Sequence, residues 1–401
     1  MHAPDPAVSP FAAQVDRRTV ADLRAAGSLK WSMFPDRIGA FVAESDLGTA
    51  PAVREALREA VEAERFGYLA PYQVAAMTEA FAGWAADRYG WAVDAERVRP
   101  VGDVLAAFRA TVRHFSEPGA TIVLPTPAYM PFLAVPATLG RRVVQVPLVE
   151  DGGRLVHDLD AIGRALRTGG GDGRSGGLLV LCNPHNPTGR VLDRDELLGI
   201  AHVVDVHGAR VFADEIHAPL VLAGHRHVPY ASVDPVAAAH AVTATSASKA
   251  WNVPGLKCAQ VVLGSAADAA RWAEVGEEYE HGTANLGVIA ATAAYSQGGP
   301  WLDEALAYLD GNRRLLGDLL AARLPAVRYR PPEGTYLAWL DCRGLGLGDH
   351  PARTFAAGGV ALTDGPDCGE VGRGFVRHTL ATPRPVLRET VELLAAAVAG
   401  R

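Results

Sequence analysis

The sequence predicts an α/β protein that is built on a mostly parallel sheet and has a second, smaller domain. Short apolar runs alternate with amphipathic stretches through the middle of the chain, and strand–helix alternation implies crossover connections between parallel strands. Several runs are continuous in Val, Leu and Ala, which is typical of strands buried on both faces. At 401 residues, the chain is also too long for a single hydrophobic core.

The elements follow in chain order. Asp103 is suited to cap a helix that begins at Val104, because apolar residues recur at helical spacing after it. The expected strands are Ala120–Leu124, Arg142–Val146, Gly177–Cys182, Ala209–Ala213, Ala241–Thr245 and Cys258–Leu263.

After Gly299 the pattern changes. One long helix, Leu302–Leu324, is expected to end at Pro325, and it is followed by short strands near Val327–Tyr329 and Tyr336–Asp341 and a last helix over Pro385–Val398. We therefore expect a large domain over residues 48–290. Residues 1–47 and 291–401 together should form the small α+β domain.

Composition excludes several classes of function. The net charge of -7 and the pI of about 6.0 give no electrostatic attraction for nucleic acid or an anionic membrane. The four cysteines share no CxxC spacing, so we expect a reduced cytoplasmic protein without a metal site. The N-terminus lacks the pattern of a signal peptide, and no apolar stretch reaches the roughly 20 residues that span a bilayer.

Polar clusters follow three of the predicted strands. They are Asn183–Gly189, Asp214–His217 and Ser246–Lys249. The carboxyl ends of parallel strands meet at one edge of a sheet, where open α/β sheets bind their ligands. The sequence therefore predicts a ligand site at this edge.

Lys249 and Asp214 suggest what the site binds. A lysine just beyond a buried strand loses solvation, which lowers its pKa and frees the amine as a nucleophile for a carbonyl; the alternative is a surface lysine at a strand end. A buried Asp214 needs a partner, and a pyridinium N–H would supply one. A phosphate could lie at the start of the helix at Val104, with Ser246 and Lys257 beside it, although a capping Asp103 would compete for the same amides.

At these residues the chain resembles the fold-type-I pyridoxal-phosphate (PLP) enzymes of the aspartate aminotransferase superfamily. The similarity is greatest to the MalY/PatB branch of cystathionine β-lyase-like C–S lyases. The motifs that carry it include NPHNPTGR (Asn183–Arg190), ADEIHAPLV (Ala213–Val221), TATSASKAWNVPGLKCA (Thr243–Ala259), PEGTYLAWLD (Pro332–Asp341) and FVRHTLAT (Phe375–Thr382). The resemblance implies a seven-stranded, mostly parallel sheet in the large domain.

The resemblance also implies a role for each cofactor-side residue. Lys249 would form the Schiff base with PLP and later move the Cα proton. Asp214 would pair with the pyridine nitrogen, Asn186 would bind the ring 3′-oxygen, and Tyr129 would stack on the ring. The remaining contacts implied are His217, in a position where aminotransferases usually have a tyrosine, and a phosphate cup made of Asp103, Val104, Ser246 and Lys257.

On the substrate side, the resemblance implies that Arg377 clamps the substrate carboxylate, with Asn186 nearby. Tyr68 resembles the tyrosine that the neighbouring subunit lends to the site, which implies a homodimer with shared active sites. The chain departs from the branch pattern at Phe41–Leu47, at Thr379 and at Leu69–Tyr72. All three departures are expected near the substrate, which suggests a specialised biosynthetic substrate.

The expected activity is α,β-elimination from a cysteine S-conjugate to a thiol, pyruvate and ammonia. Two alternatives share the same residues: an aminotransferase, and a decarboxylating oxidative deaminase of a cysteine S-conjugate. A PLP-binding regulatory module is a further alternative, but the first thirty residues are too short and too rich in Pro and Ala for a helix-turn-helix.

Overall fold

A seven-stranded sheet forms the centre of the computed structural model, which describes residues 9–400. In spatial order its strands are β2 (Val98–Val101), β10 (Ala259–Leu263), β9 (Ala241–Thr245), β8 (Arg210–Asp214), β7 (Leu178–Cys182), β3 (Ile122–Thr126) and β4 (Val143–Pro147). Neighbouring strands from β9 to β4 are all parallel, whereas β10 runs antiparallel to β9 and β2. The predicted α/β class and the mostly parallel seven-stranded sheet are confirmed.

The six strands expected from the sequence are all present, displaced by at most two residues at either end. Within the seven-stranded sheet, the strand that the pattern did not identify is β2. It has four residues, lies at the edge of the sheet and contains Pro100. Proline has no N–H to donate to the hydrogen bonds between strands, so a sequence that contains it does not indicate a strand. It is nevertheless tolerated in an edge strand such as β2.

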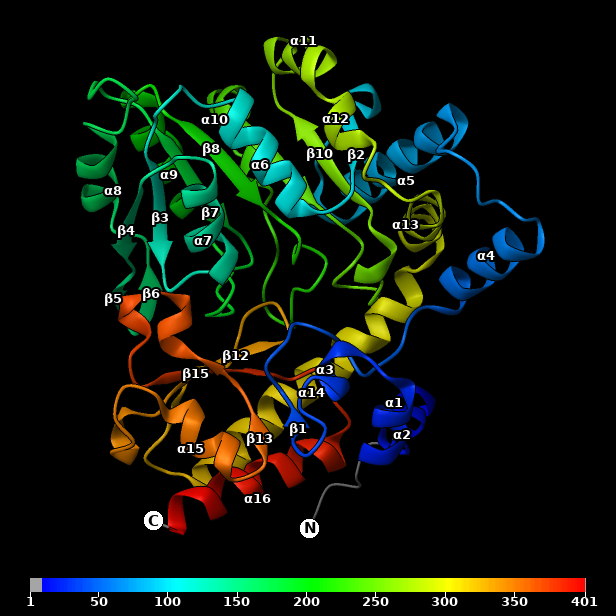
Figure 1. Ribbon diagram of the computed structural model, residues 1–401, viewed down its shortest axis with the longest axis vertical. Helices are drawn as coiled ribbons and strands as arrows, with labels where there is room; N and C mark the ends of the chain where they lie inside the picture. Colours follow the sequence, from blue (N-terminus) through cyan, green and yellow to red (C-terminus); the bar gives the residue numbers. More distant parts are fainter. Residues whose placement is uncertain (1–8, 401) are drawn as a thin grey trace.

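Helices cover both faces of the sheet (Figure 1). Alternate residues of β7 face opposite ways: Leu178 and Val180 belong to one apolar cluster, Leu179 and Leu181 to another. The first cluster is closed by α6 (Val104–His114), α7 (Met130–Thr138) and α11 (Ala266–Val275); the second by α8 (Leu159–Leu166), α9 (Arg194–Val206) and α10 (Pro235–His240). Burial on both faces explains why these strands read as continuous apolar runs.

Three further helices form a group at the β2 side of the sheet, where the last of them packs against the other two. They are α4 (Pro51–Glu62), α5 (Pro71–Tyr89) and α13 (Asn285–Gln297). Trp84 of α5 and Tyr295 of α13 form an aromatic group with Trp251, whose ring centroid is 5.2 Å from that of Trp84. The short α12 (Glu277–Glu280) precedes α13.

A second sheet lies near the C-terminal end of the chain. It is antiparallel, with the order β11 (Arg328–Tyr329), β12 (Leu337–Asp341), β15 (Phe375–Thr379) and β14 (Thr363–Asp364). The long helix α14 (Gly299–Arg323) packs against the final helix α16 (Arg384–Ala399), and α15 (Pro351–Ala357) also contacts α16. A hairpin of β5 (Val149–Asp151) and β6 (Arg154–Val156) extends from the large sheet.

The N-terminal segment joins this second sheet region. It contains α1 (Pro10–Asp16), α2 (Val20–Ala26), α3 (Leu29–Ser32) and β1 (Ile38–Gly39). β1 pairs in parallel with β13 (Val360–Ala361), and Figure 1 shows the blue N-terminal helices beside the red α16. Segments from the two ends of the chain thus lie together, while the division at residues 48–290 stays a prediction.

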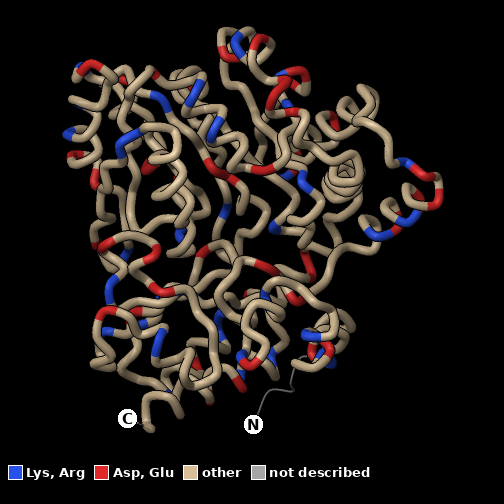
Figure 2. The backbone as a smooth tube through the Cα atoms, in the orientation of Figure 1, with Lys and Arg blue, Asp and Glu red and all other residues tan. Residues whose placement is uncertain are grey.

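Figure 2 shows basic and acidic residues interspersed over both sheet regions. On α4, Arg58 forms ion pairs with Glu55 and Glu62 on neighbouring turns. Across residues 9–400, none of the helices has both the length and the apolar character that a membrane crossing requires.

Gly189 sets the contact between the loop after β7 and the segment before β12. Its carbonyl accepts from the Glu333 and Gly334 amides at 2.8 and 2.9 Å. Its φ is +74°, and a Cβ at this position would lie 2.3 Å from the Cβ of Pro332. Only a glycine satisfies both the backbone conformation and this close approach.

Gly189→Ala should therefore destabilise the protein more than Gly208→Ala does. Gly208 also has a positive φ, +59°, but has nothing within 4 Å of the added methyl. The control should cost about 1 kcal/mol from backbone strain alone, and Gly189→Ala should cost at least about 2 kcal/mol because the clash is added. Urea unfolding measures both. If both variants lose the same free energy of unfolding, Pro332 can move away from the added methyl group without cost.

Candidate active site

Three neighbouring strands deliver polar side chains to one edge of the large sheet. β7 ends at Cys182, β8 at Asp214 and β9 at Thr245. The parallel register pairs Cys182 with Asp214, and Asp214 with Ala244 of the next strand. Lys249 lies in the turn that follows β9. The strand order therefore brings the three predicted clusters to the same edge.

Lys249 carries a partly buried amine that forms no ion pair with any residue from 9 to 400. The chain contains three lysines, Lys30, Lys249 and Lys257, and the other two are in ion pairs. The Lys249 amine instead donates to the Ala43 carbonyl at 2.9 Å. Burial, and then the positive charge of Arg377, lower the pKa of Lys249 to about 8. Such an amine is available as a nucleophile or base near neutral pH.

Asp214 is a buried carboxylate that lacks a cationic partner. Its Oδ1 accepts from the Ile216 amide at 3.1 Å, and its Oδ2 lies 3.7 Å from the Cys182 thiol. Burial raises the pKa of Asp214 to about 6. Among residues 9–400, this carboxylate forms no ion pair. It therefore suits a ligand that brings a buried N–H cation, such as the protonated ring of PLP.

Arg377 reaches the site from β15 and connects three parts of the chain. Its Nη1 donates to Asn186 Oδ1 at 3.0 Å, and its Nη2 donates to the Phe41 carbonyl at 2.7 Å and to Thr363 Oγ1 at 3.1 Å. The residue is 2% exposed. Among the described residues, its Nε has no hydrogen-bond partner. A buried guanidinium with a free N–H can take a carboxylate ligand.

Tyr129 and His217 lie in the same environment. Tyr129 precedes α7 as its N-cap residue, and burial, followed by the negative charge of Asp214, raises the pKa of its hydroxyl. Burial, followed by the charges of Lys249 and Arg377, lowers the pKa of His217 well below its usual value. His217 is therefore neutral, and within residues 9–400 its Nδ1 has no partner.

The predicted phosphate cup is assembled in part. Asp103 caps α6, accepting from the Ala106 amide at 2.8 Å, and Lys257 Nζ lies 3.0 Å from the other Asp103 oxygen. The first N–H groups of α6, from Val104 onward, have no partner within the helix. Ser246 Oγ donates to the Cys258 carbonyl at 2.7 Å. The Asp103 carboxylate thus accepts from one α6 amide and from Lys257. It therefore competes with a phosphate for the same donors, as expected from the sequence.

Tyr68 does not reach Lys249 within one chain. It lies between α4 and α5 and is 99% exposed. The loop is anchored by Asn285, whose Nδ2 donates to the Arg65 and Gly67 carbonyls at 2.8 Å. The contribution of Tyr68 to a neighbouring subunit stays a prediction.

Sequence reasoning missed the acceptors that hold the two cations of the site. The Ala43 carbonyl accepts from Lys249 and also from the Tyr336 hydroxyl at 3.0 Å. The Phe41 carbonyl accepts from Arg377 and from the Thr363 hydroxyl at 2.7 Å. A backbone carbonyl leaves no signal in sequence. Only the departure of Phe41–Leu47 from the family pattern pointed to this segment.

Of the other departures, Thr379 lies on β15, two positions beyond Arg377 in the sequence. Its amide donates to the Ala40 carbonyl at 3.0 Å, so it adjoins the same segment. Leu69–Tyr72 follows Tyr68 and runs into the first turn of α5, which begins at Pro71. Its place near a substrate stays a prediction that depends on a second subunit.

Comparison with known proteins agrees with this geometry. The cystathionine beta-lyase of Corynebacterium glutamicum is 36% identical over 381 residues, covering 93% of this chain and 97% of that protein. The cystathionine beta-lyase PatB of Bacillus subtilis is 33% identical over 380 residues, covering 92% of this chain and 96% of PatB.

A solved structure is also similar. The PLP-bound C–S lyase from Staphylococcus hominis superimposes with a TM-score of 0.87 at 27% identity, covering 96% of this chain and 98% of that one. The family described as aminotransferase class I and II matches residues 38–394. Given a match over most of its length, and the partly buried lysine and buried aspartate at the carboxyl edge of its sheet, this chain belongs to the class I and II aminotransferase family.

Proposed function

We propose that this chain is a PLP-dependent carbon–sulfur β-lyase acting on cysteine S-conjugates. The reaction breaks the Cβ–S bond and, with one water, gives a thiol, pyruvate and ammonia. The observation that carries PLP dependence is a partly buried Lys249 amine at the same sheet edge as a buried Asp214, with no ion pair between the two. Relatives named as cystathionine β-lyases and a C–S lyase support the same reaction.

The residues at the sheet edge would hold PLP. Asp214 would pair with the protonated ring nitrogen, Tyr129 would stack on the ring, and Asn186 and His217 would contact the ring from the remaining sides. When bound, PLP supplies an electron sink for a carbanion at Cα. The N-terminal amides of α6, from Val104 onward, with Ser246, would hold the phosphate.

Lys249 and Arg377 would act on the substrate. Arg377 would hold the α-carboxylate, because a buried guanidinium is preorganised for a planar anion. The neutral amine of Lys249 would then take the Cα proton, since its pKa of about 8 leaves a useful unprotonated fraction near neutral pH. Because Arg377 would fix the substrate carboxylate and Lys249 would lie beside Cα, proton removal and loss of the thiolate would proceed without a further entropic cost of orienting these groups.

We further propose a homodimer with shared active sites. Tyr68 is 99% exposed, and it is accompanied by exposed Phe66 and Tyr72. A cavity of about 990 Å³ lies beside it and is lined by residues of α5 and α12. Exposed aromatic side chains next to a hollow are typical of a protein interface.

A cytoplasmic location is also part of the proposal. The four cysteines, Cys182, Cys258, Cys342 and Cys368, are all free and buried, as is usual in a reducing compartment. Cell fractionation tests this, and recovery of the protein outside the cytoplasm would contradict it.

The reaction is tested by incubating the PLP-loaded protein with a panel of cysteine S-conjugates and no oxoacid acceptor. A β-lyase should release thiol, pyruvate and ammonia in equal amounts, because one elimination yields one of each. Thiol is measured with a disulfide reagent and pyruvate with a coupled dehydrogenase. Conversion of the bound PLP to its pyridoxamine form without release of thiol would identify an aminotransferase, and release of carbon dioxide with an aldehyde would identify a decarboxylating deaminase.

Shared sites can be tested by mixing two inactive variants. Lys249→Ala should abolish turnover because the base is lost, and Tyr68→Ala should strongly reduce it. After reassociation, the mixed dimer has one site with Lys249 from one chain and Tyr68 from the other. Recovery of about a quarter of wild-type activity is expected, because half of the random dimers carry one intact site. If Tyr68 serves its own chain, mixing restores nothing.

Asp214→Asn should stabilise the cofactor-free protein at alkaline pH. The Asp214 pKa rises from its ordinary 3.8 to about 6 on folding, so the folded state retains the proton that the unfolded chain has lost. The stability contribution of the protonated carboxyl is complete below about pH 4 and is lost as the pH rises through about 6. Two pKa units correspond to about 3 kcal/mol at most.

Urea unfolding at pH 4 and pH 8 measures this difference. The variant should exceed the wild type at pH 8 and match it near pH 4, and added PLP should stabilise the wild type more than the variant. Equal pH dependence of the two proteins would contradict the burial of an unpaired carboxylate.

A further inference from the structure

One backbone segment, residues 40–47, holds both cations of the site. The Phe41 carbonyl accepts from Arg377 at 2.7 Å, and the Ala43 carbonyl accepts from Lys249 at 2.9 Å. The two side chains come from different sheet regions, so their relative position depends on where this segment lies. A displacement of about 1 Å in such a contact can greatly slow a reaction.

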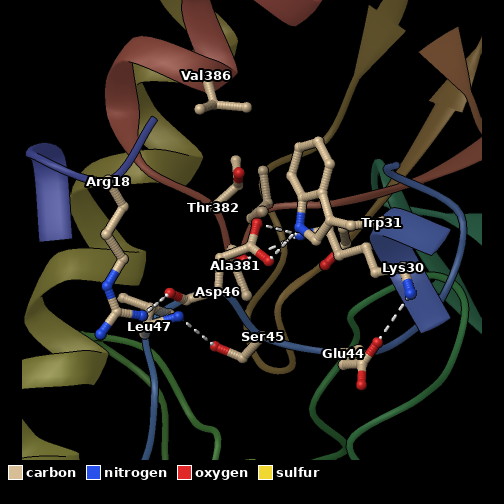
Figure 3. Close-up of polar contacts among 12 residues, drawn as sticks. Arg18, Lys30, Trp31, Glu44, Ser45, Asp46, Leu47, Ala381, Thr382 and Val386 are labelled. Atoms are coloured by element: carbon tan, nitrogen blue, oxygen red, sulfur yellow. Dashed lines mark hydrogen bonds and ion pairs between the residues drawn. The ribbon is translucent and has the colours of Figure 1, made fainter. Parts of the chain in front are cut away.

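On the side of α3, the segment is anchored by the side chain of Asp46, which is 5% exposed. Its Oδ2 accepts from Lys30 Nζ at 2.6 Å, and its Oδ1 accepts from Trp31 Nε1 at 2.8 Å. Lys30 Nζ also donates to the Ala381 carbonyl at 3.2 Å, which in turn accepts from the Asp46 amide at 2.9 Å. Figure 3 shows Trp31 above the Asp46 carboxylate, with Arg18 approaching the segment from the other side.

The same segment is anchored above to the turn that carries Lys249. Asn252 Oδ1 accepts from the Ser45 amide at 3.1 Å, and Asn252 Nδ2 donates to the Ser45 carbonyl at 2.8 Å. The chain just before the segment passes so close to α3 that a Cβ on Gly39 would lie 1.9 Å from the Lys30 carbonyl oxygen. The segment is therefore held between α3 and the Lys249 turn.

Stability alone does not account for a buried ion pair of this kind. Lys30 is fully buried, and the cost of desolvating two charges roughly offsets their attraction. Apolar side chains of similar volume would stabilise the fold as well. The charged and hydrogen-bonding groups instead fix the orientation of the Asp46 side chain, because each carboxylate oxygen accepts from one particular donor, Lys30 Nζ or Trp31 Nε1.

We propose that Lys30, Trp31 and Asp46 form a positioning triad that fixes residues 41–45 against Lys249 and Arg377. Among the described residues, none of the three side chains forms a hydrogen bond with Lys249 or Arg377. The triad acts through the Phe41 and Ala43 carbonyls, and its consequence for catalysis rests on the proposed lyase function.

Two variants loosen the triad without leaving a buried charge unpaired. Trp31→Phe keeps an aromatic ring in the cluster with Leu23, Ile38 and Val386 and removes the indole N–H, together with the volume by which indole exceeds phenyl. Lys30→Met with Asp46→Asn removes both charges together. The control is Asp268→Asn, which breaks the ion pair of Asp268 with Arg210, 2.8 Å long, at the start of β8 and away from the site.

Hydrogen exchange of the cofactor-free chain measures the positioning directly. One lost hydrogen bond corresponds to roughly threefold to tenfold faster opening, so the amides of residues 40–47 should exchange about threefold faster in Trp31→Phe and about tenfold faster in the double variant. In the loaded enzyme, KM for the conjugate should rise by a similar factor while kcat changes less. Asp268→Asn should change neither quantity.

The outcomes separate this inference from the proposed reaction. Exchange does not depend on turnover, so it tests whether the triad holds residues 40–47 in place even if the wild type proves not to be a lyase. The proposal is overturned if residues 40–47 exchange no faster in the triad variants than in Asp268→Asn. It is equally overturned if exchange rises in an active lyase while KM and kcat stay at wild-type values, because the triad would then only stabilise the fold.

Discussion

The site depends on a single constraint: a carboxylate and an amine are held near each other in a poorly solvated edge without pairing. Burial disfavours the charged form of each, which is why the pKa of Asp214 rises to about 6 and that of Lys249 falls to about 8. An ion pair between the two would stabilise the charged form of each and so oppose both pKa shifts. Neither group would then be free to react. In the structure the Lys249 amine donates to the Ala43 carbonyl instead, and Asp214 accepts from the Ile216 amide. Each group therefore remains free for an external partner, a ring cation for one and a carbonyl carbon for the other.

Much of this edge could be predicted from the sequence, because strand ends are encoded by apolar periodicity. The runs that end before Asn183, Asp214 and Ser246 are buried on both faces, so their limits are sharp, and the carboxyl-edge rule then brings the clusters together. Arg377 was found only through family resemblance. Its strand, β15, reads Phe-Val-Arg-His-Thr, so three polar residues in five leave no apolar run to mark it, and β2 was missed because Pro100 interrupts it.

The remainder of the site lies beyond what a single sequence can indicate. Every residue has a carbonyl, so nothing marks those of Phe41 and Ala43 as acceptors for Arg377 and Lys249. Their position follows from anchors far away in the chain, such as the contact of Asp46 with Ala381. The role of Tyr68 is likewise not decided within one chain, because an exposed tyrosine acquires a function only from the surface that meets it.

The donors of Arg377 indicate how substrate binding is linked to the segment. A guanidinium has five N–H groups, and both hydrogens on Nη2 are in use, one to the Phe41 carbonyl and one to Thr363 Oγ1. A carboxylate bound through two N–H groups uses Nη2 with either Nη1 or Nε, so one of these partners must give way. The Thr363 hydroxyl also donates to the Phe41 carbonyl, so release of either contact changes what holds residue 41. Carboxylate binding and the position of residues 41–45 are therefore coupled through the Arg377 guanidinium. When a bound carboxylate displaces one Arg377 contact, the anchor at Asp46 limits how far the Ala43 carbonyl can shift away from Lys249.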